Sequence, residues 1–263
     1  MTYKTVFVRI IKWLKVLFSV FLDIVLTRRS DDGVQYIWKR HGANTLVIVF
    51  TGMGPQRYNY KRTLRRSPYD ILFIRDCWAN NASYYWYEHK GNHPELLTQK
   101  LIDHIVCSGN YETLITVGSS KGGTAAIYYG LKNHAKTIIA GACQYYVGQY
   151  LAKHQYVEKP YQWHDVVGGE PKQEQEWIDI LDHKLPKMID ANSGCDTELY
   201  LVYSTEEHTY QEHIAPLVAK LDECRIQHHD QVERFQQHSM IGHYFSEALN
   251  KLLVDSVTKM PNM

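Results

Sequence analysis

The sequence has little that would suggest a disulfide framework, a zinc site or a nucleic-acid surface. The formal net charge is only +1 over 263 residues, so no global field attracts nucleic acid. Its five cysteines are scattered, odd in number and without a C-x-x-C pair, namely Cys77, Cys107, Cys143, Cys195 and Cys224. That spacing argues against zinc or a disulfide scaffold and indicates a reducing, cytoplasmic compartment.

The sequence also lacks a charge-free apolar run long enough for a conventional membrane-spanning helix. Residues 1–30 instead contain one amphipathic helical pattern, read as continuous to Arg29, with its alternating faces in residues 3–27. The polar sector consists of Lys4, Arg9, Lys12, Lys15, Ser19 and Asp23. The opposite sector consists of Ile10, Trp13, Leu14, Leu17, Phe18, Phe21, Ile24 and Val25. This pattern predicts a helix on an anionic membrane surface, such as the inner face of the cell membrane. A helix docked on a partner or on the body of the protein, or an uncleaved anchor, is the alternative.

Internal repeats and low-complexity tracts are absent, and residues 31–263 are interpreted as one catalytic domain. Short β-branched runs alternate with helical patterns, which predicts an α/β fold with a doubly wound, mostly parallel sheet. The predicted strands are 34–38, 45–51, 69–75, 113–118, 137–142, 198–204 and, as a polar edge strand, 226–235. Residues 144–195 are rich in aromatics and contain no clear strand, so we expect a helical cap insertion there.

A glycine-rich turn at residues 118–123 carries the main functional signal. The G-x-x-x-x-G-K-[ST] phosphate loop does not fit, because Lys121 precedes the glycine pair, and the dinucleotide pattern G-x-G-x-x-G is absent. The pattern G-x-S-x-G does fit, with Gly118, Ser120 and Gly122 at its fixed positions. A β-rich run precedes it and a helix-forming run follows, which is typical of a turn that exposes a nucleophilic serine.

A nucleophilic serine needs a base, and in this architecture the chain order is serine, acid, histidine. The end of the strand at 198–204 offers Glu206 and Glu207, and Glu207 is preferred because it lies further into the turn. The loop after the last predicted strand offers His238, with His243 as the alternative at the start of the final helix. Metal binding is not expected, because the histidine pairs lack the spacing that would place two ligands on one helical face.

An oxyanion hole requires two N–H groups that converge on the reacting carbonyl. The backbone N–H of Lys121, directly after the nucleophile, is one predicted donor. The second is the N–H of Met53, with Gly52 shaping the turn after the strand at 45–51.

Four segments together resemble a known group of proteins: "FTGMG…YNYKRTL", "SSKGGTAAIYYGL", "STEEHTYQEHIAPL" and "HSMIGHYF". They are similar to α/β-hydrolase-like proteins of capsular-polysaccharide biosynthesis and to glycan O-acetyltransferases of the serine-triad type. The resemblance covers roughly residues 45 to 250. It implies an α/β-hydrolase fold, a triad of Ser120, Glu207 and His238, and transfer of an acetyl group to a glycan hydroxyl. The acid is often aspartate in such enzymes, so the glutamate departs from the family pattern.

Three functions are compatible with these residues. The first is O-acetylation of a bacterial surface or capsular glycan through an acyl-Ser120 intermediate, with acetyl-CoA as acyl donor and no tightly bound cofactor. The second is an esterase or deacetylase in which water takes the acyl group. The third is a non-catalytic, hydrolase-like scaffold in polysaccharide biosynthesis or export, in which the triad would not assemble.

Overall fold

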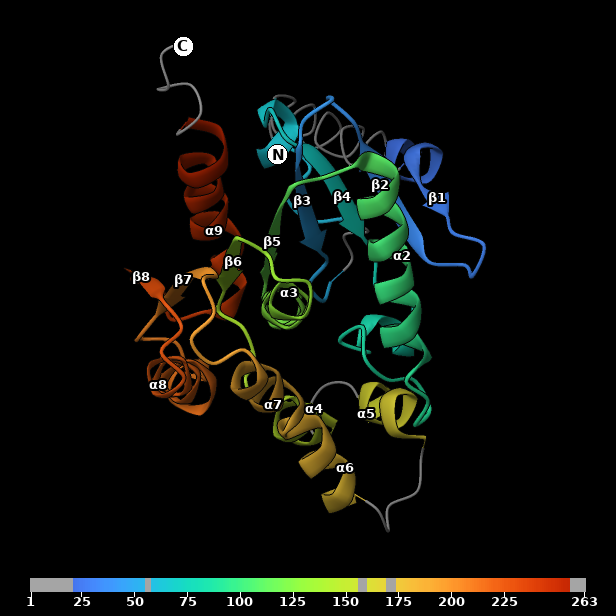
Figure 1. Cartoon of the computed structure of the whole chain (residues 1–263). Coiled ribbons are helices and arrows are strands. Elements are labelled where there is room, and N and C mark those ends of the chain that lie inside the picture. The colour runs from blue at the N-terminus through green and yellow to red at the C-terminus, as the bar shows by residue number, and fades with distance from the viewer. Residues whose placement is uncertain (1–20, 55–57, 156–159, 169–173, 256–263) are drawn as a thin grey trace, which may run out of the picture.

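The computed structural model describes residues 21–54, 58–155, 160–168 and 174–255, and within them one eight-stranded sheet forms the core (Figure 1). The spatial order is β1-β2-β4-β3-β5-β6-β7-β8. β2 pairs antiparallel with β1 and β4, and the remaining neighbours are parallel. The predicted doubly wound, mostly parallel sheet is therefore confirmed. The strands are β1 (Arg28–Arg29), β2 (Gln35–Lys39), β3 (Thr45–Phe50), β4 (Asp70–Ile74), β5 (Thr113–Ser119), β6 (Thr137–Gly141), β7 (Glu198–Ser204) and β8 (His228–Glu233).

Helices cover both faces of the sheet, which explains why its central strands are continuously apolar. Every residue of β4 is buried, and in β3 only the first is not. One face packs against α2 (His93–Gly109), α3 (Lys121–Lys132), α7 (Lys184–Ala191) and α8 (Ala215–Glu223). The other packs against η1 (Thr63–Arg66), α9 (Ile241–Asn250) and η6 (Lys251–Asp255). The strands whose ends carry the candidate site are therefore packed between two hydrophobic clusters, one on each face of the sheet.

Four helices between β6 and β7 gather beyond α3, at the lower end of Figure 1. They are α4 (Val147–Gln155), α5 (Pro160–Val167), α6 (Glu174–Asp182) and α7. All lie inside the range expected for the cap, of which residues 156–159 and 169–173 are outside the described part. α6 and α7 follow one another directly and are separated only at His183.

Only the end of the expected N-terminal helix falls within the described residues, because residues 1–20 lie outside them. Residues 21–26 are helical, and the chain then enters β1. Continuation of the helix to Arg29 is therefore wrong: Arg28 and Arg29 pair with Tyr36 and Gln35 of β2. Within the described residues, no helix is both long enough and apolar enough to cross a bilayer.

Candidate active site

Ser120 occupies a sharp turn between β5, which ends at Ser119, and α3, which begins at Lys121. Its backbone has φ 53° and ψ −130°, a conformation that L-residues rarely adopt. The turn is held by the Ser120 N–H, which donates to the carbonyl oxygen of Gly141 at 2.7 Å, and by the Gly123 N–H, which donates to the Ser120 carbonyl at 2.8 Å. The local strain places the serine side chain at the carboxyl end of the parallel strands.

The glycines of the motif are required by space. A Cβ on Gly118 would lie 2.0 Å from the carbonyl oxygen of Gly122, and a Cβ on Gly122 would lie 2.4 Å from the carbonyl oxygen of Phe50. A Cβ on Gly52 would approach the carbonyl oxygen of Ser119 to 3.2 Å. The turn can therefore close onto β3 only if side chains are missing at these positions.

The structure brings Ser120, His238 and Glu207 into one hydrogen-bonded chain. His238 Nε2 lies 2.8 Å from Ser120 Oγ, and His238 Nδ1 lies 2.7 Å from Glu207 Oε1. A carboxylate can only accept, so Nδ1 carries the proton and Nε2 is free to accept the serine proton. These three elements, the turn after β5, the loop after β7 and η5 (His238–Met240), can therefore activate the serine as a nucleophile.

The two alternative residues lie elsewhere. Glu206 is exposed, and its backbone N–H donates to Ser204 Oγ at 3.1 Å. His243 lies on α9 with 62% of its side chain exposed, 3.4 Å from Glu247. The geometry thus favours Glu207 and His238 over their neighbours.

Glu207 is suited to orient a histidine that becomes positively charged. Its side chain is buried, and burial alone would raise its pKa, but the hydrogen bond and charge of His238, with a bond from Thr209 Oγ1 at 2.7 Å, hold the pKa below its usual value. A carboxylate kept ionised next to Nδ1 stabilises the imidazolium that forms when Nε2 takes a proton.

The two predicted oxyanion donors come from the start of α3 and from the loop after β3. Lys121 is the first residue of α3, so its N–H belongs to the first turn, whose N–H groups lack intrahelical acceptors. The N–H of Gly52 is already used, because it donates to Asn59 Oδ1 at 3.0 Å. This bond fixes the loop after β3 and leaves Met53, the next residue, as the candidate for the second donor.

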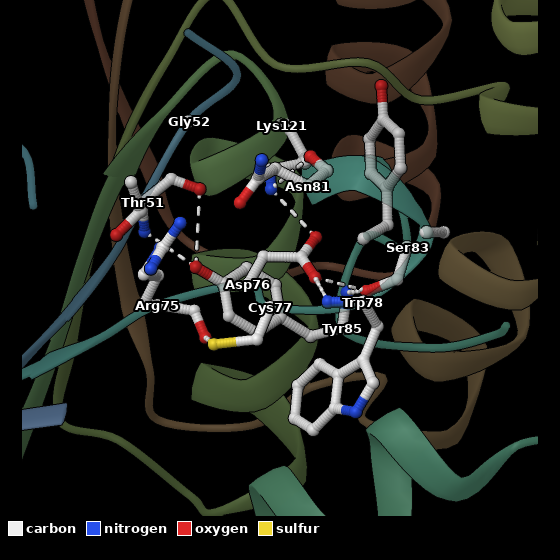
Figure 2. Close-up of polar contacts among 12 residues, drawn as sticks. Thr51, Gly52, Arg75, Asp76, Cys77, Trp78, Asn81, Ser83, Tyr85 and Lys121 are labelled. Atoms are coloured by element: carbon white, nitrogen blue, oxygen red, sulfur yellow. Dashed lines mark hydrogen bonds and ion pairs between the residues drawn. The ribbon is translucent and has the colours of Figure 1, made fainter. Parts of the chain in front are cut away.

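A buried ion pair lies directly beneath the nucleophile turn, and Figure 2 shows its two side chains pointing toward one another. The Lys121 ammonium lies 2.7 Å from Asp76 Oδ2 and also donates to the carbonyl oxygen of Asn81 at 2.7 Å, and neither Lys121 nor Asp76 has an exposed side chain. The other carboxylate oxygen of Asp76 accepts from Ser83 Oγ at 2.6 Å and from the Trp78 N–H at 3.2 Å. Burial lowers the pKa of Lys121, and the charge of Asp76 opposes that shift.

The same buried region supports the loop after β3 (Figure 2). The Thr51 N–H donates to the hydroxyl of Tyr85 at 2.7 Å, and that hydroxyl lies 3.0 Å from the carbonyl oxygen of Ile74. The Lys121 ammonium lies 5.1 Å from the centre of the Tyr85 ring. One polar cluster therefore sets the positions of both segments from which the oxyanion donors are expected.

Two further side chains contact the turn. Gln144 is fully buried, and its Nε2 lies 3.3 Å from Ser120 Oγ while its Oε1 accepts from the Tyr84 hydroxyl at 3.2 Å. On the other side, the Tyr60 hydroxyl contacts Ser119 Oγ, and burial raises the pKa of Tyr60 to about 12. The tyrosine is thus a neutral link between the loop after β3 and the nucleophile strand.

A cavity of about 580 Å³ lies between α4, α6 and η4 (Tyr210–Ile214). The segments that form its walls follow residues of the site along the chain: Tyr146 follows Gln144 by two residues, and η4 begins three residues after Glu207. The two walls are joined where the Tyr146 N–H donates to His213 Nδ1 at 3.3 Å. The cavity is therefore linked to the site through the loops after β6 and β7, and none of Ser120, Glu207 and His238 lines it.

Sequence reasoning missed Asp76, Tyr85 and Gln144. A usable signal existed for two of them, since Asp76 follows the apolar strand at 69–75 and Gln144 follows the strand at 137–142. Polar residues just beyond the carboxyl ends of parallel strands commonly face a binding site. Tyr85 offers no such signal, because it lies in an irregular loop whose path only the folded structure shows.

Comparisons with known proteins show what this architecture is similar to. No protein-family model matches the sequence, and no curated protein matches it significantly. Among solved structures, the capsule O-acetyltransferase of Neisseria meningitidis serogroup A superposes with TM-score 0.71 and 18% identity, over 86% of this chain and 93% of that one. A mutant of that enzyme in complex with CoA gives TM-score 0.72 and 17% identity, over 86% and 94%. A fluorophosphonate-binding serine hydrolase of Staphylococcus aureus gives TM-score 0.64 and 11% identity, over 88% and 97%. The chain has the α/β-hydrolase fold, as expected.

Proposed function

We propose that the protein is a serine-dependent acyltransferase that O-acetylates a bacterial surface or capsular glycan, with acetyl-CoA as acyl donor. The observation that carries this proposal is the hydrogen-bonded chain from Ser120 Oγ through His238 to Glu207, with contacts of 2.8 Å and 2.7 Å. The likeness to a capsule O-acetyltransferase, in one case with CoA bound, supports the choice of acetyl transfer.

In the first half-reaction, His238 Nε2 takes the hydroxyl proton of Ser120 while Oγ attacks the thioester carbonyl carbon. The negative charge on the carbonyl oxygen is met by the N–H groups of Lys121 and Met53. When the tetrahedral intermediate collapses, the carbon–sulfur bond breaks, the sulfur takes the proton from His238, and CoA leaves as the free thiol. An acetyl ester remains on Ser120.

In the second half-reaction, a sugar hydroxyl replaces the thiol. His238 Nε2 takes its proton as the sugar oxygen attacks the acetyl carbonyl, and the same N–H groups stabilise the second oxyanion. The bond to Ser120 Oγ then breaks, and the serine recovers its proton from His238. Glu207 stays ionised throughout and stabilises the imidazolium in both steps.

The acceptor is proposed to bind in the cavity between α4 and η4. Its volume of about 580 Å³ is in the usual range of ligand sites. The lining combines the rings of Tyr146 and Tyr150 with polar groups, which suits a sugar, since its rings have apolar faces and hydroxyl edges. The charged groups are Lys153, which pairs with Glu212 at 2.6 Å, and Glu174.

The acceptor site can be tested separately from the triad. Tyr150→Ala is expected to raise the KM for a glycan acceptor at least about fivefold through loss of the ring surface, without slowing formation of acyl-Ser120. Tyr69→Ala, at a half-exposed position before β4, is the matched control. An unchanged acceptor KM in Tyr150→Ala would remove the cavity from the proposal and leave the triad in place.

The central test is intact-mass detection of an acetyl adduct after incubation with acetyl-CoA or an activated acetyl ester. Ser120→Ala should abolish the adduct, transfer and background hydrolysis, whereas Ser119→Ala, one residue away and also a serine, should have a far smaller effect. Faster formation of acetylated sugar than of free acetate supports transfer. Dominant acetate release with every capsule-type acceptor would support the esterase or deacetylase, which the likeness to serine hydrolases also favours. Full biological function of Ser120→Ala would support the scaffold instead.

The proposed location is the cytoplasm, at the inner face of the cell membrane. Acetyl-CoA as donor and the scattered, unpaired cysteines support the compartment. The basic amphipathic pattern of residues 3–27 supports contact with the membrane, although residues 3–20 lie outside the described part of the chain.

A further inference from the structure

The last turn of the N-terminal helix exposes an unusual amount of apolar surface. Phe21, Ile24, Val25 and Leu26 are 60%, 55%, 61% and 46% exposed. Within the described residues, these four side chains make up half of the eight large hydrophobics that are exposed. Single exposed apolar residues need no explanation, but a cluster of this kind marks a surface that contacts something else.

The helix end is attached to the body by its polar edge, so the apolar side chains point away from the core. Asp23 is buried and forms an ion pair with Lys61, and Thr27 Oγ1 lies 3.0 Å from the hydroxyl of Tyr58. These contacts explain why an aspartate of the polar sector is hidden while Phe21 and Val25 are exposed. The orientation of the helix end is therefore set by bonds to the segment between β3 and η1.

A basic hollow begins at the next residue along that segment. Arg62, Arg65 and Arg66 are exposed and, with Thr63, Asn250 and Val254, line a cavity of about 350 Å³. Among the side chains that the structure describes, no carboxylate forms an ion pair with any of the three arginines. Guanidinium groups match the geometry of phosphate oxygens, so three of them gathered around one hollow favour an anionic ligand.

We propose that the helix end and this arginine hollow together form a docking surface for an anionic phospholipid membrane. Arg62, Arg65 and Arg66 bind lipid phosphates, while Phe21 and Val25 insert at the boundary between headgroups and acyl chains. A free phosphate would account for the arginines but not for the neighbouring apolar side chains, and this is why a lipid surface is the occupant. The arginine hollow belongs to the body of the protein, so the proposed surface extends membrane contact beyond residues 3–27, and it does not depend on the acyl-transfer chemistry.

The test uses the full-length chain and sedimentation with vesicles of phosphatidylcholine alone or with 30% phosphatidylglycerol, roughly the range in which surface charge dominates peripheral binding. Arg65→Glu/Arg66→Glu should weaken binding to the anionic vesicles at least about tenfold, because four units of charge change at the contact. Lys136→Glu/Lys187→Glu makes the same change of net charge elsewhere on the exposed surface and should bind like the unmodified protein. Phe21→Ser/Val25→Ser should also weaken binding to the anionic vesicles. Leu96→Ser is the matched control, because Leu96 is an apolar residue of α2 that is 58% exposed, and it should leave binding unchanged.

All the altered side chains are exposed, so circular dichroism and thermal unfolding should show folded variants. Wild-type binding by Arg65→Glu/Arg66→Glu would overturn the proposal. So would equal weakening by the two charge-reversal pairs, because only net charge would then matter. A final arm adds inorganic phosphate without vesicles: thermal stabilisation that depends on Arg65 and Arg66, together with no vesicle binding, would identify a soluble phosphate ligand and overturn the lipid.

Discussion

Lys121→Met is expected to loosen the turn that carries the nucleophile, because it breaks the buried ion pair beneath it. The lysine side chain is fully buried, and its ammonium joins Asp76 to the carbonyl of Asn81 at 2.7 Å each. Methionine fills a similar volume without charge, so the change removes the pair with little loss of packing. The carboxylate of Asp76 is then left buried without a cation.

The magnitude follows from what remains around that carboxylate. Removal of one partner from a buried pair destabilises a protein by about 3–5 kcal/mol. Here the second carboxylate oxygen of Asp76 keeps its bonds from Ser83 and Trp78, so we expect the lower end, about 3 kcal/mol. For a domain of this size that corresponds to a decrease in Tm of roughly 6–12 °C. Asp76→Asn should have a comparable effect, and the double variant should recover about 1–3 kcal/mol of the summed loss.

Activity reports whether the pair also positions the site. Displacement of the Lys121 N–H and of Ser120 should lower kcat for an activated acetyl ester by about tenfold to a hundredfold at temperatures where the variant is folded, with a smaller change in KM. Labelling of Ser120 by a fluorophosphonate should slow in parallel. Lys132→Met is the matched control at the far end of the same helix: the lysine side chain is 29% exposed, and its ammonium pairs with the buried carboxylate of Glu95, away from the turn.

Two results would refute this reasoning. If Lys121→Met unfolds at the wild-type temperature, the ion pair does not stabilise the fold. If it is destabilised but retains wild-type kcat and wild-type labelling of Ser120, Lys121 is a structural residue and does not position the turn. Chemical denaturation of the two single variants and the double variant, followed by circular dichroism, gives the coupling free energy directly.

Three shorter predictions concern other buried groups. The pKa of Glu95 is lowered to about 2, because hydrogen bonds from two lysines and a tyrosine outweigh the opposing effect of burial. The ionised carboxylate therefore contributes stability that is complete above pH 4.5 and is lost as the pH falls toward 2. Glu95→Gln should lower the free energy of unfolding by on the order of 2–3 kcal/mol at pH 7 and by much less at pH 3, as measured by urea unfolding. Gln144→Leu removes the amide 3.3 Å from Ser120 Oγ and should lower kcat at least about tenfold, and wild-type kinetics would contradict a role at the nucleophile. Gly118→Ala should prevent folding or destabilise by more than about 3 kcal/mol, because its Cβ would lie 2.0 Å from a backbone oxygen, whereas Gly242→Ala meets nothing within 4 Å and should be tolerated in thermal unfolding.

The parts of the fold that sequence predicts well are those whose local pattern and tertiary role agree. The run at 45–51 is continuously apolar because β3 is covered on both faces, and the polar run at 226–235 contains β8 because that strand lies at the sheet edge. β1 was missed because two arginines have no strand pattern, and their conformation depends on pairing with β2. The division between α6 and α7 was missed because the helical periodicity continues across His183.

The residues of the candidate site also fall into those that the sequence predicts and those that depend on tertiary contacts. Ser120, Glu207 and His238 could be proposed because chain order and strand ends carry the information. Outside the site, the burial of Asp23 could not be predicted, because its ion pair with Lys61 is a tertiary contact. Asp76 could not be paired with Lys121 for the same reason: the two residues are 45 positions apart, and each taken alone resembles an exposed charge.

The triad itself does not decide between transfer and hydrolysis, because the proposed acyl ester on Ser120 would react with any hydroxyl that His238 can deprotonate. Water is present at about 55 M, so a transferase must give the sugar hydroxyl a higher effective concentration at the ester. Well-oriented groups reach effective molarities of about 10⁵–10⁸ M, far above that of water. A sugar held against Tyr146 and Tyr150, on the segment that continues from Gln144, would gain this advantage next to the ester. The ratio of acetylated sugar to acetate should therefore fall in Tyr150→Ala, although the triad is unchanged. An unchanged ratio would mean that the acceptor is oriented by residues outside this cavity.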